Sequence, residues 1–265
     1  MRIKIAHNTT YIYDHPVSGA LQQVRLQPVD GPLQQVRNWD IDVEHGSVAA
    51  SYRDHHGNRV SLICADEGAT GLTITARGEV DTEDKAGVLG PVYGRAPLWY
   101  FQQSTALTKA GPLIKAIADG VPDQGSELEK MHLLSAAVLG AVPYTLNETH
   151  TETKAEEAAG QGSGVRQDHA YIFISAARLL GFPARYVSGY LVMDDRIDQD
   201  ASHAWAEAHI TGLGWVGFDV SNQISPDERY VRLAIGRDAH DAAPISGLRI
   251  GHGEESLIVS LQVQQ

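Results

Sequence analysis

Apolar and polar residues alternate along the first third of the chain. Ile3, Ile5, Thr9, Tyr11 and Tyr13 fall on one side of an extended segment, as a half-buried strand requires. Turn signals containing Gly, Pro and Asn separate further segments of this kind. The pattern therefore predicts an antiparallel β domain over residues 1–85. Its other expected strands lie at residues 24–26, 39–43, 59–63 and 72–80.

The spacing becomes helical after a linker at residues 86–100. Between residues 113 and 138 apolar side chains recur every three or four positions in two stretches, which predicts two amphipathic helices. From residue 168 to 180 apolar side chains nearly encircle the helix. We expect this third helix to be buried at the centre of its domain and to end at Gly181 and Pro183.

Strand patterns return after the third helix. Residues 184–192, 204–210 and 214–219 read as strands, and a glycine-containing turn joins the last two into a hairpin. The order of sheet, helices and sheet predicts an α+β fold. We expect a core domain over residues 101–265, with the central buried helix packed on an antiparallel sheet and a C-terminal strand at residues 257–263.

The composition excludes some classes of partner. The formal net charge is −12, whereas a nucleic-acid partner requires clustered Lys and Arg. The chain has no apolar run of about eighteen residues that predicts a membrane span, and no apolar signal segment at its N-terminus. We therefore expect a cytoplasmic protein that binds neither nucleic acid nor membrane, and no cofactor. The pattern indicates no particular oligomeric state.

Three positions have the spacing of a hydrolase site. The third helix begins near Arg166, His203 begins one strand of the hairpin, and Asp219 ends the next. In a thiol or serine hydrolase a nucleophile lies at a helix N-terminus, a His is its base, and a carboxylate fixes the tautomer of that His. Arg166 stands where the nucleophile is expected. A guanidinium stays protonated, with a pKa above about 12, and cannot attack a carbonyl carbon.

Other nucleophiles do not replace it. Cys64 is the only cysteine and lies in the β domain, where we expect a small buried hydrophobe. Ser163 reads as a turn or cap residue, and Ser188 has no base beside it in the sequence. Ser202 adjoins His203 on one strand, so the two side chains point to opposite faces.

Four ordered motifs resemble the bacterial transglutaminase-like proteins, a branch of the papain-like cysteine protease and transglutaminase superfamily. The segment at residues 164–168, G-V-R-Q-D, is similar to that family's Gly-Val-Cys-Gln-Asp motif. Residues 181–190 (G-F-P-A-R-Y-V-S-G-Y), 202–207 (S-H-A-W-A-E) and 214–219 (G-W-V-G-F-D) match the motifs that follow it. The start of the chain also resembles the family's N-terminal β region, so the resemblance covers nearly all of the sequence.

The resemblance implies a catalytic triad in which His203 and Asp219 remain and Arg166 occupies the cysteine position. It also implies a cleft at this site, to which Gln167 and Asp168 belong through the first motif. Two aromatic side chains complete the expected cleft. Tyr144 resembles a cleft-wall aromatic of the family, although a buried core position is an equal alternative. Trp205 is expected to pack the sheet against the central helix and to help line the cleft.

Arg166 has two alternative roles. A cation at a helix N-terminus is electrostatically unfavourable, so it needs a carboxylate partner or an anionic ligand. In the first alternative Arg166 pairs with Asp168 or Asp219 and plugs the cleft. In the second, Arg166 and the helix N–H groups bind a carboxylate or a phosphate.

The chain contains 12 His, but none of them is spaced as His-x-x-x-His and the single cysteine excludes a Cys-x-x-Cys pair, so we expect no metal site. Two functions remain open. The first is a transglutaminase-like protein that has lost thiol chemistry and binds a peptide, a protein or an anionic group in the relic cleft. The alternative is a cysteine peptidase or transglutaminase-like enzyme whose nucleophilic Cys is replaced by Arg166 only in this version of the chain. A variant of the second function has a metal at His203 performing amide hydrolysis.

Overall fold

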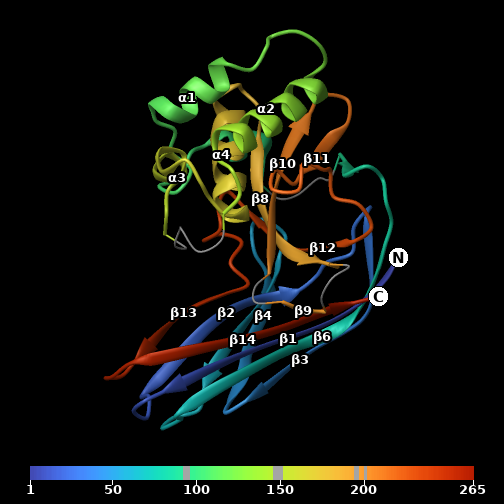
Figure 1. Ribbon diagram of the computed structural model, residues 1–265. Coiled ribbons are helices and arrows are strands. Elements are labelled where there is room, and N and C mark those ends of the chain that lie inside the picture. The colour runs from blue at the N-terminus through green and yellow to red at the C-terminus, as the bar shows by residue number, and fades with distance from the viewer. Residues whose placement is uncertain (92–95, 146–151, 194–196, 200–201) are drawn as a thin grey trace.

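The structure, a computed structural model, describes residues 1–91, 96–145, 152–193, 197–199 and 202–265. Within these residues the chain forms three antiparallel sheets and four α-helices, which confirms the predicted α+β class. The helices gather at one end of the molecule and the longest strands splay out at the other (Figure 1).

The N-terminal region is built from two sheets. Alternate residues of the first strand are buried, as the period-two pattern predicted. Ile3, Ile5, Leu26 and Ile74 belong to the shared core of these sheets. The strand orders are β3-β6-β1-β14-β9 and β13-β2-β5-β4. Their first six strands are β1 (Arg2–Tyr13), β2 (Gly19–Gln27), β3 (Gln34–Glu44), β4 (Gly46–Arg53), β5 (Arg59–Ala65) and β6 (Gly71–Thr82).

The end of the chain returns to the N-terminal sheets. Strand β13 (Ile245–Ile250) pairs with β2, and β14 (Glu255–Gln264) pairs with β1 and with the short β9 (Asp198–Gln199). The C-terminal strand therefore completes the N-terminal β region, whereas the sequence pattern had assigned it to the core domain. The alternation of Leu257 to Val263 specifies a strand, but it does not specify which edge that strand extends.

The expected linker also contributes to the core. Strand β7 (Val88–Gly90) pairs with β11, and a 3₁₀ turn (Leu98–Gln102) follows. Phe101 from this turn contacts Trp215 edge to face, with ring centroids 5.2 Å apart. The segment between the two predicted domains is thus partly an edge strand of the core sheet.

The core domain is one sheet covered by helices. The strand order is β12-β8-β10-β11-β7, with β8 (Ala184–Leu191), β10 (His203–Ile210), β11 (Gly214–Phe218) and β12 (Tyr230–Gly236). The helices are α1 (Pro112–Asp119), α2 (Glu127–Ala141), α3 (Ala155–Gln161) and α4 (Arg166–Leu179).

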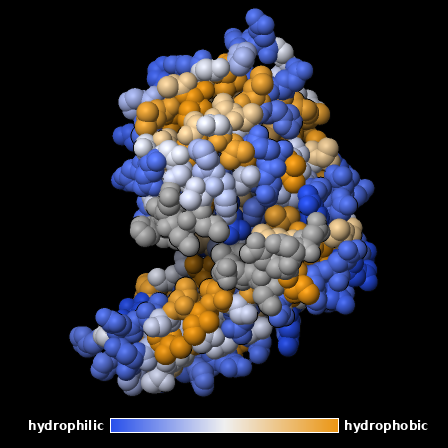
Figure 2. Space-filling view, in the orientation of Figure 1, coloured by the Kyte–Doolittle hydropathy of each residue, from blue (hydrophilic) through white to orange (hydrophobic). Residues whose placement is uncertain are grey.

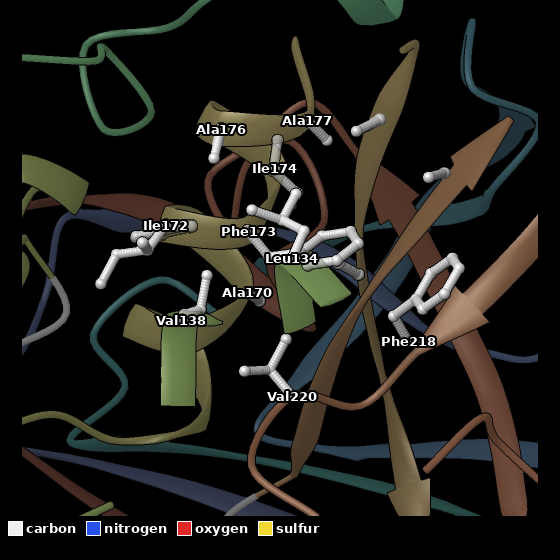
Figure 3. Packing of buried hydrophobic residues seen from close by; sticks show 14 of the residues in the cluster. Leu134, Val138, Ala170, Ile172, Phe173, Ile174, Ala176, Ala177, Phe218 and Val220 are labelled. Atoms are coloured by element: carbon white, nitrogen blue, oxygen red, sulfur yellow. The ribbon is translucent and has the colours of Figure 1, made fainter. Parts of the chain in front are cut away.

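Helix α4 lies at the centre of the core, as predicted. Every residue from Asp168 to Ala177 is buried. Phe173 stacks on Phe218 of the sheet, with ring centroids 5.1 Å apart, and Leu134 and Val138 of α2 belong to the same apolar cluster (Figure 3).

The helix ends as its sequence predicted. Gly181 takes a left-handed φ of 88°, its N–H bonds to Arg178, and the N–H of Phe182 bonds to the carbonyl of Ala177. This pair of bonds is a Schellman motif, in which glycine avoids the steric cost of positive φ.

Buried polar contacts join the N-terminal region to the core sheet. The imidazole Nδ1 of His7 lies 2.9 Å from the Tyr190 hydroxyl. Gln34 donates to the carbonyl of Arg232 at 2.8 Å and accepts from its N–H at 2.7 Å. Since Tyr190 is also part of the apolar core of the N-terminal region, the two bodies share buried surface.

Hydrophobic residues gather on the surface of the lower β region (Figure 2). The exposed apolar side chains of β13 and β14 include Leu248, Ile250, Leu257 and Ile258. No helix in the described part of the chain is long and apolar enough to cross a membrane.

The buried His7 predicts acid sensitivity. Burial lowers the pKa of His7 to about 4, whereas an unfolded His titrates near about 6.5. Between these values only the unfolded state binds the proton, so the free energy of unfolding falls as pH drops from about 6.5 toward about 4. His7→Gln should reduce this slope by up to about 1.4 kcal/mol per pH unit.

Urea titrations at several pH values between 4 and 7 measure the slope. The matched control is His252→Gln, the same substitution at an exposed position away from the contact of His7 with Tyr190. An equal slope in the His7 variant and the unmodified protein would contradict this account.

Candidate functional site

The first turn of α4 is held by a loop and by its own carboxylate. Gly164 and Tyr144 form an isolated parallel β-bridge. The N–H of Gly164 donates to the carbonyl oxygen of Pro143, and the N–H of Thr145 donates to the carbonyl oxygen of Gly164. Asp168, fully buried, accepts the N–H of Val165 at 2.8 Å. A carboxylate in the first turn also complements the positive end of the helix dipole. The side chain of Arg166 therefore leaves the helix from a fixed point.

His203 and Asp219 meet at the ends of paired strands. His203 begins β10, Asp219 directly follows β11, and the two strands are antiparallel neighbours. The Nε2 atom of His203 lies 2.5 Å from Oδ2 of Asp219, and both side chains are buried. The structure thus brings together the two residues that the sequence placed in a triad.

Asp219 accepts hydrogen bonds from two residues besides His203. Asn222 donates its side-chain amide to Oδ2 at 2.8 Å and its backbone N–H to Oδ1 at 3.2 Å. The Tyr230 hydroxyl donates to Oδ2, also at 2.8 Å. Burial alone raises the pKa of Asp219, but the hydrogen bonds from His203, Tyr230 and Asn222 outweigh it and lower the pKa. Asp219 is therefore an ionised, fully coordinated carboxylate.

Arg166 faces the other nitrogen of the same imidazole. Its Nη1 lies 3.4 Å from Nδ1 of His203. A guanidinium can only donate, so Nδ1 presents a lone pair and Nε2 carries the proton toward Asp219. The two contacts therefore point to the tautomer in which Nε2 carries the proton and Nδ1 faces Arg166.

This contact corrects one expectation for Arg166. In the described part of the chain no ion pair joins Arg166 to Asp219, because His203 separates the two groups. Of the five N–H donors of the guanidinium, one is used on His203, and the side chain remains half-exposed.

These groups open onto a pocket of about 630 Å³, which we call the α4 pocket. Arg166 and His203 both contribute to its lining. The complete lining is Tyr144, Arg166, Leu191, Val192, Met193, His203, Ser221, Asn222, Ile224, Arg229 and Tyr230.

Of the other residues that were expected in the cleft, one lines the pocket and another stabilises the start of α4. Tyr144 lines the α4 pocket and is 41% exposed, so the cleft-wall alternative holds over a core position. Asp168 supports the helix start, and neither it nor Gln167 lines the pocket.

Trp205 differs from its expected packing. Ala204, Ala206 and Ala208 of β10 belong to the cluster with α4, whereas Trp205 belongs to the cluster on the opposite face of the sheet. It stacks on His203 with ring centroids 6.1 Å apart. Successive strand residues face opposite sides, and the small alanines are the residues that admit the helix. Trp205 thus supports the imidazole from behind.

A second cavity, of about 260 Å³, lies between the loop at Asp30–Gln34 and the core sheet. Glu207 lies in its wall, bonded to Arg185 at 2.5 Å and to Arg232 at 2.9 Å. Neither Arg166 nor His203 lines it. The α4 pocket is therefore the better candidate for function.

Sequence reasoning missed four polar residues of the α4 pocket, one of which is Arg229. Tyr230 and Asn222 bind Asp219, and Ser221 bonds through Oγ to Nδ1 of His169 at 2.8 Å. Ser221 and Asn222 follow Asp219 directly in the sequence, and this closeness could have marked them as site residues. No sequence signal marks the contact between Ser221 and His169, because the turn after Asp219 and helix α4 are far apart in the chain.

The fold and site define a transglutaminase-like protein with an N-terminal β region. Residues 3–81 match the bacterial transglutaminase-like N-terminal region, and residues 115–220 match the transglutaminase-like superfamily. Together these regions cover more than half of the chain. The chain belongs to the transglutaminase-like superfamily.

Several bacterial proteins are similar to it. An uncharacterised protein of Mycobacterium leprae is 28% identical over 279 residues, covering 99% of this chain and 98% of its own. An uncharacterised protein of Mycobacterium tuberculosis is 34% identical over 147 residues, which is 51% of this chain and 47% of its own. A candidate cysteine protease from Cytophaga hutchinsonii shares the fold, with a TM-score of 0.79 at 22% identity over 100% of this chain and 90% of its own.

The network on Asp219 predicts the effect of Tyr230→Phe. This change removes one hydrogen bond to a buried carboxylate, so it should lower the free energy of unfolding by about 1.5–3 kcal/mol at pH 7. Denaturant unfolding measures the loss. Tyr52→Phe is the control, since Tyr52 is exposed and accepts only a 3.3 Å bond from Gln23; its cost should stay within about 0.5 kcal/mol. Equal costs for the two variants would rule out a role for the network.

Proposed function

We propose that this protein is a transglutaminase-like pseudoenzyme that has lost thiol acyl transfer and binds a peptide or protein through an anionic group in the α4 pocket. The observation that carries the proposal is the contact between Arg166 and Nδ1 of His203. That nitrogen is the one a nucleophile at this helix start needs as its base. A permanent cation there leaves the His–Asp pair without a proton to accept.

The charges of the pocket favour an anionic ligand. Arg166 stands at the start of α4, where the helix dipole adds positive potential. Asp219, the buried carboxylate behind His203, is already bonded to His203, Tyr230 and Asn222. A carboxylate that enters the pocket can therefore accept from the outward N–H groups of Arg166 in a charge-assisted hydrogen bond.

The walls of the pocket suit a peptide. Leu191, Val192, Met193 and Ile224 supply apolar surface, and the half-exposed Tyr144 ring stands at one side. Ligand sites commonly combine apolar walls with a few fixed polar groups. An extended segment with a carboxylate, at an acidic side chain or a chain end, matches both features.

Arg166→Gln tests this binding. It keeps a hydrogen-bonding side chain but removes the charge, so affinity for a carboxylate should fall about 10–100-fold. Calorimetric or NMR titration would compare peptides that carry a free carboxylate with their amidated counterparts. Arg59→Gln is the control, because Arg59 is exposed on β5, outside the pocket. Equal affinity for amidated and free peptides would contradict the proposal.

The second candidate is a cysteine peptidase or transglutaminase-like enzyme that carries Arg166 only in this version of the chain. The intact pairing of His203 with Asp219, and the support of Asp219 by Tyr230, favour it. In a working site of this kind the carboxylate orients the general base, and Tyr230 and Asn222 hold Asp219 in place for that role.

Arg166→Cys discriminates between the two candidates. If the site is otherwise catalytic, the new thiol should ionise beside His203 and react with iodoacetamide at least about tenfold faster than Cys64. Peptide mapping after timed alkylation separates the two cysteines. Amine donors and glutamine-containing peptides then report turnover. A new thiol that reacts no faster than Cys64 would eliminate the enzyme reading.

The protein as it stands should give no turnover with the same substrates. Turnover that disappears in His203→Ala would instead show that the His–Asp pair is still at work, and would overturn the proposed loss of chemistry.

A further inference from the structure

A hydroxyl–imidazole pair lies at the wall of the α4 pocket, which Arg166 also lines. Ser221 lies in the turn after Asp219, is half-buried, and lines the pocket. Its Oγ is 2.8 Å from Nδ1 of His169. His169 is on α4, one turn beyond Arg166, and is fully buried.

The tautomer of His169 is fixed by the backbone. Its Nε2 lies 2.7 Å from the carbonyl oxygen of Val142, which can only accept, so Nε2 carries the proton. Nδ1 therefore presents its lone pair, and the Ser221 hydroxyl donates to it. This is the arrangement of an activated hydroxyl: nucleophile, base, and a third group that orients the base.

The ring is also in the protonation state that a base needs. Burial lowers the pKa of His169, against smaller raising effects of the bond to Val142 and of Asp168 and Asp219. The imidazole is accordingly neutral near pH 7.

Ser221 differs from the other serines near the site. Ser188 is buried and donates to the carbonyl of Ala242 at 2.7 Å, so its hydroxyl is committed to the backbone. Ser221 combines partial exposure, a place in the pocket wall and a base at hydrogen-bond distance. Arg166 lines the same pocket, so its guanidinium is the cation available to an oxyanion that forms there.

We propose that Ser221 and His169 hydrolyse activated carboxylic esters through a serine acyl-enzyme. The Ser221 Oγ attacks the ester carbonyl carbon as its proton passes to Nδ1 of His169, and the oxyanion forms beside Arg166. Collapse breaks the bond to the alcohol oxygen, which takes the proton from Nδ1. Water then attacks the acyl group by the same route and releases a carboxylic acid. The net reaction consumes one ester and one water and yields one acid and one alcohol.

This activity shares the α4 pocket and Arg166 with the proposed anion binding, but it has its own nucleophile and base. Covalent labelling reports on Ser221 and His169, whereas the peptide titrations report on Arg166 and the thiol chemistry considered above concerns His203. Failure of one proposal therefore does not decide the other.

The test is labelling with a fluorophosphonate probe, followed by peptide mapping. We expect the label on Ser221 and at least a tenfold loss of labelling in Ser221→Ala. Ser256→Ala is the matched control, because Ser256 is exposed on β14 and outside the pocket. No label, a label on another serine, or equal labelling of Ser221→Ala and the unmodified protein would overturn the proposal.

Hydrolysis of p-nitrophenyl acetate supplies a second readout with a pH profile. The rate should fall on the acid side with an apparent pKa below the 6.5 of a free imidazole, because protonated His169 has no lone pair. His169→Gln should lower the rate at least tenfold and remove this acid limb. Since the change is at a buried residue, folding of the variant is checked by circular dichroism. If that variant does not fold, Ser221→Cys decides: its thiol should alkylate faster than Cys64 with the same acid limb, and a slower thiol would overturn the proposal.

Discussion

The burial of α4 on every side is the constraint on which the site depends. A helix that contacts solvent along one face can rotate or shift at small cost, but one enclosed by other helices and by the sheet is held by close packing in all directions. The stacking of Phe173 on Phe218 fixes the helix against the sheet, and the Schellman bonds at Gly181 fix where it ends. Arg166 and His169, one turn apart, therefore meet the sheet at defined points.

The same packing buries Asp219 at the end of the core sheet, and this burial determines which hydrogen bonds form around it. Asp219 is buried, and a buried carboxylate is stable only when hydrogen bonds replace its lost hydration. His203, Asn222 and Tyr230 supply those bonds from three separate places in the chain. The same bonds set the tautomer of His203, so the polarity of the pocket lining at His203 results from satisfying one buried charge.

The elements with a strong period were predictable from sequence. Helix α4 was expected because apolar residues encircle it, and β1 because its apolar residues alternate; both patterns reflect local burial. The partner of β14 was not predictable, since alternation records which face is buried but not which edge is joined. Trp205 was assigned to the wrong face for a related reason: its size suggested the main core, while the adjacent alanines leave the space that α4 fills. His203 and Asp219 were found through motif spacing. Tyr230 and the pair of Ser221 with His169 depend on contacts between distant segments, for which one sequence carries no signal.

The pairing of β14 with β1 has a consequence for biosynthesis. From Lys4 to Tyr13 the second edge of β1 is closed only by residues 255–264. While the ribosome makes the intervening segments, that edge exposes unpaired N–H and C=O groups, the arrangement that promotes pairing with other chains. Strand β1 can therefore acquire this edge only once residues 255–264 have emerged from the ribosome, long after β1 itself, and it remains open to wrong pairing during that interval.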